Sequence, residues 1–94
     1  MRILLTYDIC TETPEGRRRL QKIAKLCEAN GVRVQDSVFE MTPDPRRLCS
    51  IREALLSMMN QEEDSIRIYP LAQNEPDRME ILGRQVKAGP FLSV

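Results

Sequence analysis

The stretch GVRVQDSVFEM at residues 31–41 decides the fold. Residues 32–35 alternate between apolar and polar side chains and predict a strand, and residues 37–41 predict another, with Asp36 at the break. Gly31, just before the first strand, is typical of a helix end. The stretch therefore predicts two strands in succession, between two helical segments.

A helical pattern lies on each side of this stretch. Thr13 is a candidate N-cap with Pro14 at the first helical position, and Asp44 and Pro45 repeat that arrangement before the second helix. Apolar residues then recur at the spacing of one buried helix face. These residues are Leu20, Ile23, Ala24 and Cys27 in the first helix, and Leu48, Ile51, Leu55 and Met58 in the second. The pattern predicts two amphipathic helices.

Two further strands complete the pattern. Residues 3–7 form an unbroken, mostly apolar run that ends at Asp8, and residues 65–71 alternate in polarity. The resulting order, βαββαβ, is the ferredoxin-like pattern of an α+β fold. Right-handed crossovers place both helices on one face of a four-stranded antiparallel sheet, with residues 3–7 in its middle.

The apolar run at residues 3–7 is typical of a strand covered on both faces, yet two helices cover only one. We expect a second copy of the sheet to cover the other face, which predicts a homodimer. The alternative is a monomer in which the tail, residues 72–94, folds back over this face. The tail holds a short strand candidate near residues 79–82, which must add to an edge of its own sheet or a partner's. We expect a single domain, 1–94, with its ferredoxin-like core at 1–71.

The composition excludes several kinds of chemistry. The chain has no histidine, which excludes histidine acid–base catalysis, Ser-His-Asp triads and zinc sites that use histidine. A formal net charge of zero excludes a histone-like polycation. Cys10, Cys27 and Cys49 lack C-x-x-C spacing, so we expect free thiols and a cytoplasmic protein. No apolar run approaches the roughly 18 residues of a membrane span, and no membrane contact is expected.

Asp8 is the sharpest candidate for a functional residue. It ends the predicted central strand just before a turn, where a carboxylate can hold a metal ion; the alternative is an Asx-turn residue. Mg²⁺ usually takes one or two carboxylates together with waters and phosphate oxygens. A twofold dimer would supply a second Asp8 across its axis. Glu12 and Asp36 are weaker candidates, and solvated loop charges are the alternative for both.

Basic residues gather on the first predicted helix. They are Arg17, Arg18, Arg19, Lys22 and Lys25. Arginine guanidinium groups match the geometry of phosphates, so this cluster predicts contacts with a nucleic-acid backbone; a solvated helix face is the alternative. Only two tyrosines and two phenylalanines are present, too few for a base-stacking platform. Backbone contacts should therefore dominate over base reading.

Three segments of the chain resemble the CRISPR-associated protein two family. They are LTYDI at residues 5–9, GVRVQDSVFE at residues 31–40 and DSIRIYPL at residues 64–71, and the resemblance spans about residues 1–83. The family implies a ferredoxin-like homodimer whose tail strand adds to the partner's sheet. It also implies that Asp8 faces its twin across the dimer and binds Mg²⁺.

The resemblance also assigns roles to other residues. Arg33 and the helix arginines are expected to contact nucleic acid, and Tyr7 and Phe39 to support the site. The positions that match activity-linked residues of the family are Tyr7, Arg17, Arg19, Arg33 and Phe39. The loop at Cys10 and Thr11 departs from the small or acidic residue that many relatives carry there.

The function that the resemblance implies is CRISPR adaptation, a part of antiviral defence. Members are described as Mg²⁺-dependent endonucleases that hydrolyse phosphodiester bonds in single-stranded RNA or duplex DNA. They take part in spacer integration with the CRISPR integrase, CRISPR-associated protein one. The alternative is a non-catalytic homodimeric scaffold that binds prespacer duplex DNA and bridges integrase dimers. A third reading is an unrelated ferredoxin-like regulator with a small ligand at its dimer interface.

Overall fold

A computed structural model describes residues 1–72 and 80–83 of the chain. Its secondary structure follows the predicted order of strands and helices. The elements are β1 (Arg2–Asp8), α1 (Pro14–Asn30), β2 (Val32–Gln35), β3 (Val38–Met41), α2 (Pro45–Met58) and β4 (Ser65–Leu71). The first strand extends one residue beyond residues 3–7 at each end, and the third begins at Val38 instead of Ser37.

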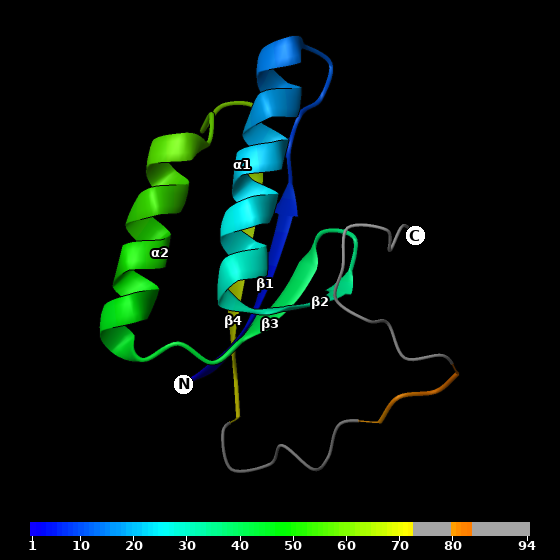
Figure 1. Cartoon of the computed structure of the whole chain (residues 1–94), viewed down its shortest axis with the longest axis vertical. Coiled ribbons are helices and arrows are strands. Elements are labelled where there is room, and N and C mark those ends of the chain that lie inside the picture. Colours follow the sequence, from blue (N-terminus) through cyan, green and yellow to red (C-terminus); the bar gives the residue numbers. More distant parts are fainter. Residues whose placement is uncertain (73–79, 84–94) are drawn as a thin grey trace.

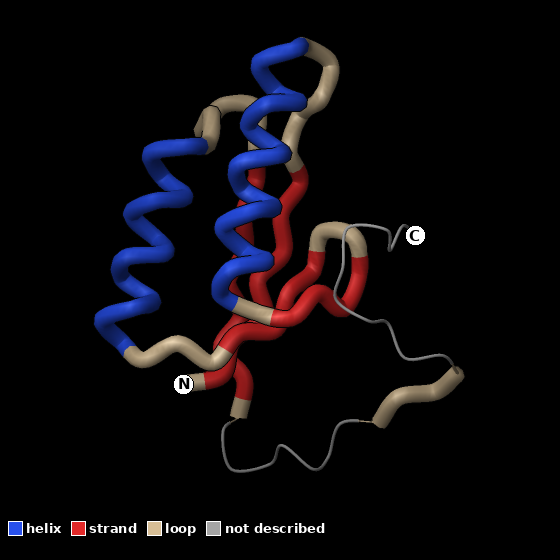
Figure 2. Tube along the Cα trace, viewed as in Figure 1, coloured by secondary structure: helices blue, strands red, loops and turns tan. Residues whose placement is uncertain are grey.

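The four strands form one antiparallel sheet in the order β2-β3-β1-β4. β1 therefore lies between β3 and β4, as predicted. Both helices pack on the same face of the sheet (Figure 1), and the strands lie behind them in a single layer (Figure 2). This arrangement confirms the ferredoxin-like α+β fold.

Local capping explains where the helices begin. The Thr13 side chain accepts a hydrogen bond from the Gly16 N–H at 3.0 Å, and Asp44 accepts one from the Arg47 N–H at 2.7 Å. Each cap is followed by proline, whose fixed φ suits the first helical position. α1 ends just before Gly31, where a β-carbon would lie 2.5 Å from the carbonyl oxygen of Glu40. Only glycine lets the chain pass from α1 to β2 this close to β3.

The core lies between the sheet and the two helices. Every second residue of β1 enters it, and Phe39 of β3 is completely buried at its centre. Its members are Ile3, Leu5, Tyr7, Ile9, Ile23, Cys27, Phe39, Met41, Leu48, Ile51 and Leu55. Burying one such aliphatic side chain stabilises a fold by about 1.5–3 kcal/mol. The predicted helix stripes are thus confirmed, with Leu20, Ala24 and Met58 packed at the margin.

The other face of the sheet, here called the open face, carries the alternate residues of the strands. Leu4 and Thr6 of β1 are half-buried there, and Tyr69 of β4 is 42% exposed. Arg2 and Glu40 form an ion pair across β1 and β3 at 2.8 Å. Within the part of the chain that the structure describes, no helix covers this face. What covers this face of β1, a second copy or the tail, stays a prediction, because most of the tail lies outside the described residues.

The predicted tail strand falls partly outside the described residues. Met79 lies outside them, and residues 80–82 belong to no strand of this sheet. Leu82 is 89% exposed and Ile81 is 48% exposed. A strand that pairs with a partner's sheet stays a prediction. Among the described residues, no helix is long and apolar enough to cross a membrane.

Candidate active site

Asp8 lies at the end of the sheet with its carboxylate exposed. Its strand neighbour on one side is Ser65 of β4. On the other side the ladder with β3 ends at Thr6, and the Tyr7 N–H donates instead to the carbonyl of Ser37 at 3.0 Å. Among the described residues, the Asp8 side chain has no hydrogen-bond or ion-pair partner. The structure thus leaves this carboxylate available for a ligand.

A pocket of about 300 Å³ surrounds Asp8 on the open face. Thr6 and Asp8 of β1 and three residues of β4, Ser65, Arg67 and Tyr69, line it. Arg67 pairs in register with Thr6, so it is the diagonal neighbour of Asp8 on the next strand. It donates to the Tyr69 hydroxyl at 3.1 Å, and this hydrogen bond raises the pKa of Arg67. The pocket therefore combines an unpartnered carboxylate with a guanidinium that is held apart from it.

Asp64 anchors the loop that follows Asp8. Its side chain is completely buried and accepts hydrogen bonds from Cys10 N–H at 3.0 Å, Asn60 N–H at 2.9 Å and Arg19 Nε at 2.8 Å. Burial alone would raise the pKa of Asp64, but these hydrogen bonds outweigh it and hold the pKa below its ordinary value. Asp64 thereby joins the loop after β1, helix α1 and the turn before β4.

Two further contacts fix the same loop. Arg17 donates to the Thr11 carbonyl at 3.1 Å. Gly16, buried in the first turn of α1, packs so closely on the loop that a β-carbon there would collide with the Cys10 carbonyl oxygen. The loop beside Asp8 is therefore held by its own helix as well as by Asp64.

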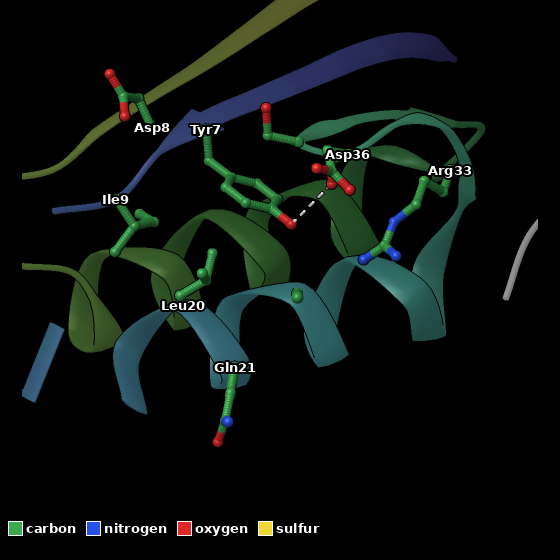
Figure 3. A pocket seen from close by; sticks show the side chains of 9 residues that line it. Tyr7, Asp8, Ile9, Leu20, Gln21, Arg33 and Asp36 are labelled. Atoms are coloured by element: carbon green, nitrogen blue, oxygen red, sulfur yellow. Dashed lines mark hydrogen bonds between the residues drawn. The ribbon is translucent and has the colours of Figure 1, made fainter. Parts of the chain in front are cut away.

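Tyr7, Phe39 and Arg33 form a stacked cluster on the helix side of the sheet. The two rings lie 6.1 Å apart at an interplanar angle of 24°, and the Arg33 guanidinium lies 5.1 Å from the centre of the Phe39 ring. The Tyr7 hydroxyl donates to the Asp36 carbonyl at 3.3 Å (Figure 3). Burial, and secondarily Cys27, raise the pKa of Tyr7 although Arg33 opposes them. These three side chains therefore pack together on the side of β1 opposite the Asp8 carboxylate.

The structure separates the four arginines that were expected to contact nucleic acid. Arg17 and Arg18 are exposed at the start of α1, where Arg18 lies 3.6 Å from Glu15. Arg19 is engaged with Asp64 and also lies 3.1 Å from Glu63. The Arg33 side chain is only 11% exposed, its Nε has no hydrogen-bond partner, and Glu28 lies 3.8 Å away. Only the first two present free surface to a large ligand.

The donor set at Asp8 fits a hard divalent cation. No group of three or more Asp, Glu, Cys or His side chains gathers in residues 1–72 and 80–83. One carboxylate with the hydroxyls of Thr6 and Ser65 in the same pocket is an all-oxygen set. Mg²⁺ accepts such a set because it keeps several waters and takes phosphate oxygens from a substrate. Glu12 and Asp36 are exposed, and Asp36 lies on the helix side of β1.

Sequence reasoning missed Asp64, Arg67 and Tyr69 as members of the site. Alternation along residues 65–71 placed Arg67 and Tyr69 on the face opposite Ile66 and Ile68, and the structure confirms this. Combined with the register of β1, that alternation could have placed Arg67 beside Asp8. No local signal pointed to the contacts of Asp64 with Arg19 and Cys10, because these partners lie 45 and 54 residues away.

The fold and this site define a small ferredoxin-like α+β protein with an open carboxylate where its central strand ends. A family model described as CRISPR associated protein Cas2 matches residues 1–79. The chain therefore belongs to the Cas2 family, and the resemblance seen in its sequence is confirmed.

Named relatives and solved structures agree with this assignment. The chain is 50% identical over 80 residues to a CRISPR-associated endoribonuclease Cas2 of Chlorobaculum tepidum, covering 85% of this chain and 83% of that protein. It is 43% identical to a CRISPR-associated endonuclease Cas2 of Halalkalibacterium halodurans, with coverage of 88% and 86%. The crystal structure of Streptococcus pyogenes Cas2 matches with a TM-score of 0.77 and 47% identity, covering 88% of this chain and 100% of that one.

Proposed function

We propose that this protein is a Mg²⁺-dependent endonuclease that hydrolyses phosphodiester bonds and acts in CRISPR adaptation. The observation that carries the proposal is the Asp8 carboxylate, exposed and unpartnered among the described residues in a pocket that also holds the Thr6 and Ser65 hydroxyls and Arg67. Relatives at 50% and 43% identity bear the names endoribonuclease and endonuclease. The absence of histidine makes carboxylate and metal chemistry the natural means of hydrolysis.

Each residue of the site has a distinct part in this proposal. Asp8 would hold Mg²⁺, which supplies Lewis-acid stabilisation of charge at a phosphate when bound. Arg67 lies in the same pocket and can donate to a phosphate oxygen, with Tyr69 fixing its orientation. Asp64 would keep the loop after β1, and with it Asp8, in place, through its hydrogen bond from the Cys10 N–H.

A homodimer completes the proposed site. The open face holds half-buried Leu4 and exposed Tyr69 and Val32, a surface that a second copy of the sheet would bury. Asp8 of the partner subunit would then supply the second carboxylate that Mg²⁺ commonly takes. We also propose that the tail strand near residues 79–82 adds to the partner's sheet at β4, which is an edge strand.

The nucleic-acid backbone would bind along the exposed basic residues of α1. Arg17 and Arg18 are exposed and could contact phosphates in addition to Thr11 and Glu15, and Lys22 and Lys25 continue the basic surface. Arg19 and Arg33 instead contact other residues of the protein. Arg19 pairs with Asp64, and the Arg33 guanidinium lies over the Phe39 ring. Because Cys10, Cys27 and Cys49 are free thiols, we place the protein in a reducing cytoplasm.

The test is cleavage of labelled single-stranded RNA and of duplex DNA by wild type and by Asp8→Ala, in Mg²⁺ and in EDTA. The proposal predicts cleavage only by wild type in Mg²⁺. Light scattering checks that the variant remains a dimer, so that lost cleavage reports the site and not the assembly. Undiminished cleavage by dimeric Asp8→Ala would reject the proposal.

A scaffold function is the second candidate, because exposed basic residues on α1 could bind duplex DNA without any part in cutting it. In that case the dimer would hold prespacer DNA and bridge dimers of the CRISPR integrase. The Asp8→Ala variant separates the two functions: a scaffold keeps duplex binding and supports integration with the integrase. An Arg17→Ala, Arg18→Ala double variant would then lose duplex binding.

A further inference from the structure

A second pocket lies on the helix side of β1, with a volume of about 390 Å³. Its floor is apolar and consists of Ile9, Leu20 and Ala24. Its rim carries a carboxylate and a hydroxyl, from Asp36 and Ser37. The Gln21 side chain points away from the pocket (Figure 3). The pocket opens between the end of β1, helix α1 and the turn that joins β2 to β3 (Figure 3). Its volume is at the lower end of the range for small-ligand sites, about 300–1,000 Å³.

Asp8 connects this pocket with the open-face pocket, since it lines both. Figure 3 shows the Asp8 carboxylate pointing away from the helices, while Tyr7, Ile9 and Leu20 lie between β1 and α1. The two pockets are therefore on opposite sides of one strand end. A partner seated on the open face would leave the helix-side pocket accessible.

The charges in the helix-side pocket argue against a phosphate as its ligand. Arg33 is the one cationic side chain in its lining, and Asp36 supplies a carboxylate, while the Asp8 carboxylate points away from the helices (Figure 3). The Arg33 guanidinium is already placed over Phe39 and near Glu28. A lining without net positive charge gives an anion no attraction but accepts a neutral group that forms hydrogen bonds. The Ser37 hydroxyl can donate and accept, and the Asp36 carboxylate can accept.

We propose that the helix-side pocket binds an unpaired nucleobase next to the phosphodiester held at Asp8. This inference rests on the proposed nuclease function. A nucleobase is flat and neutral, with apolar faces for the floor of the pocket and hydrogen-bonding edges for its rim. A base in a duplex is paired and stacked and cannot enter without being extruded. The pocket would therefore make single-stranded substrates better than duplex ones.

The first test measures binding without cleavage. The full chain, labelled with ¹⁵N, is titrated in EDTA with the nucleosides adenosine, guanosine, cytidine and uridine, and separately with inorganic phosphate. We expect nucleosides to shift the amide signals of Gln21, Ala24 and Ser37, and phosphate to leave them unchanged. Ala24→Leu fills the pocket and should weaken these shifts about tenfold in apparent affinity. Unchanged amides with every nucleoside, or equal shifts in the variant, would overturn the inference.

Matched controls separate pocket filling from damage to the fold. Ala54→Leu makes the same change at a half-buried position of α2 outside the pocket, and it should bind nucleosides as wild type does. Ser37→Ala removes the rim hydroxyl at a position outside the core and should also weaken binding. If Ala24→Leu fails to fold, Ser37→Ala decides the question, because nucleoside binding equal to that of wild type would reject the inference.

The second test uses cleavage with a substrate that lacks one base. We expect wild type in Mg²⁺ to cleave single-stranded RNA about tenfold more slowly when the nucleotide beside the cut site is abasic. Duplex cleavage should be unaffected by Ala24→Leu, whereas cleavage of the single strand should fall. Suppose that Asp8→Ala abolishes cleavage but wild type cuts the abasic RNA as fast as the intact RNA. The nuclease function then stands, and only the base pocket is rejected.

Discussion

Asp8 and Asp64 are carboxylates at the same end of the sheet in opposite surroundings. Asp8 pairs in register with Ser65, the residue that follows Asp64. The Asp64 side chain is completely buried and satisfied by Arg19 and two backbone N–H groups, while Asp8 is exposed and unpartnered among the described residues. Asp64 therefore has a structural role, whereas the Asp8 carboxylate is available to bind a ligand.

Replacing Asp64 with asparagine should destabilise the fold and make its stability less dependent on acid. The substitution leaves Arg19 without the Asp64 carboxylate and places an amide N–H opposite backbone N–H groups that need an acceptor. We expect the free energy of unfolding to fall by about 1–3 kcal/mol. The pKa of Asp64 is lowered in the folded state, so its contribution is present above the unfolded pKa of about 3.9 and is lost as pH falls through the folded value. Urea unfolding at neutral pH and at stepwise lower pH measures both effects.

Glu62→Gln is the control for this prediction, because Glu62 is an exposed carboxylate in the same turn. It should unfold with the free energy and the acid dependence of wild type. An Asp64→Asn variant that is as stable as wild type at neutral pH would contradict the anchoring role. If the free energy of unfolding depends on pH equally in Asp64→Asn and in wild type, the lowered pKa of Asp64 is contradicted.

Single residues also show what the sequence could and could not predict. The position of Asp8 at the end of the central strand was predicted correctly, because strand ends follow from local polarity patterns. The partners of Arg19 and Arg33 could not be predicted, since a guanidinium on a helix face or strand carries no signal of which distant carboxylate or ring it meets. Tertiary contacts alone decided that these two arginines are held by the protein.

Among the elements, both helices and all four strands were predictable because their signals are local. Thr13 and Asp44 cap the helices, prolines start them, and alternation marks β2 and β4. The contact between the first turn of α1 and the loop before it was not predictable. It depends on how closely Gly16 approaches the Cys10 carbonyl, which is a property of packing.

Gly16→Ala should destabilise the protein although alanine is the better helix former by about 1 kcal/mol. The new β-carbon collides with a backbone carbonyl, which cannot move aside as a flexible side chain could. We expect a lower melting temperature and slower cleavage, because the displaced loop follows directly after Asp8. Ser50→Ala at an exposed position of α2 should be neutral or slightly stabilising. A Gly16→Ala protein that is more stable than wild type would contradict the close packing.

For the whole molecule, the open face is the feature that a single chain leaves unexplained. Leu4 lies at its centre on β1, between Glu40 of β3 and Tyr69 of β4. A half-buried leucine flanked by an exposed tyrosine is typical of a surface that another subunit covers. The sequence predicted such a cover from the apolar run in β1, and a second copy of the chain as that cover stays a prediction.

Leu4→Lys should convert the proposed dimer to a monomer and abolish cleavage while the monomer stays folded. A lysine beside Glu40 is tolerated in water, but the same charge in a sheet-to-sheet interface is costly. Light scattering gives the oligomeric state, circular dichroism the fold and a labelled RNA the activity. Leu56→Lys, at a leucine that is 49% exposed on α2, should remain an active dimer. A dimeric, active Leu4→Lys protein would show that the open face is not the interface.

The most direct test of the account is the binding of Mn²⁺, as a paramagnetic stand-in for Mg²⁺, to wild type and to Asp8→Asn. Electron paramagnetic resonance reports the free ion, so the bound amount follows from the lost signal. We predict one bound ion for every two chains in wild type, because Asp8 and Asp8 of the partner subunit share it, and no ion at that affinity in Asp8→Asn. Equal Mn²⁺ binding by the two proteins would show that Asp8 does not hold the metal.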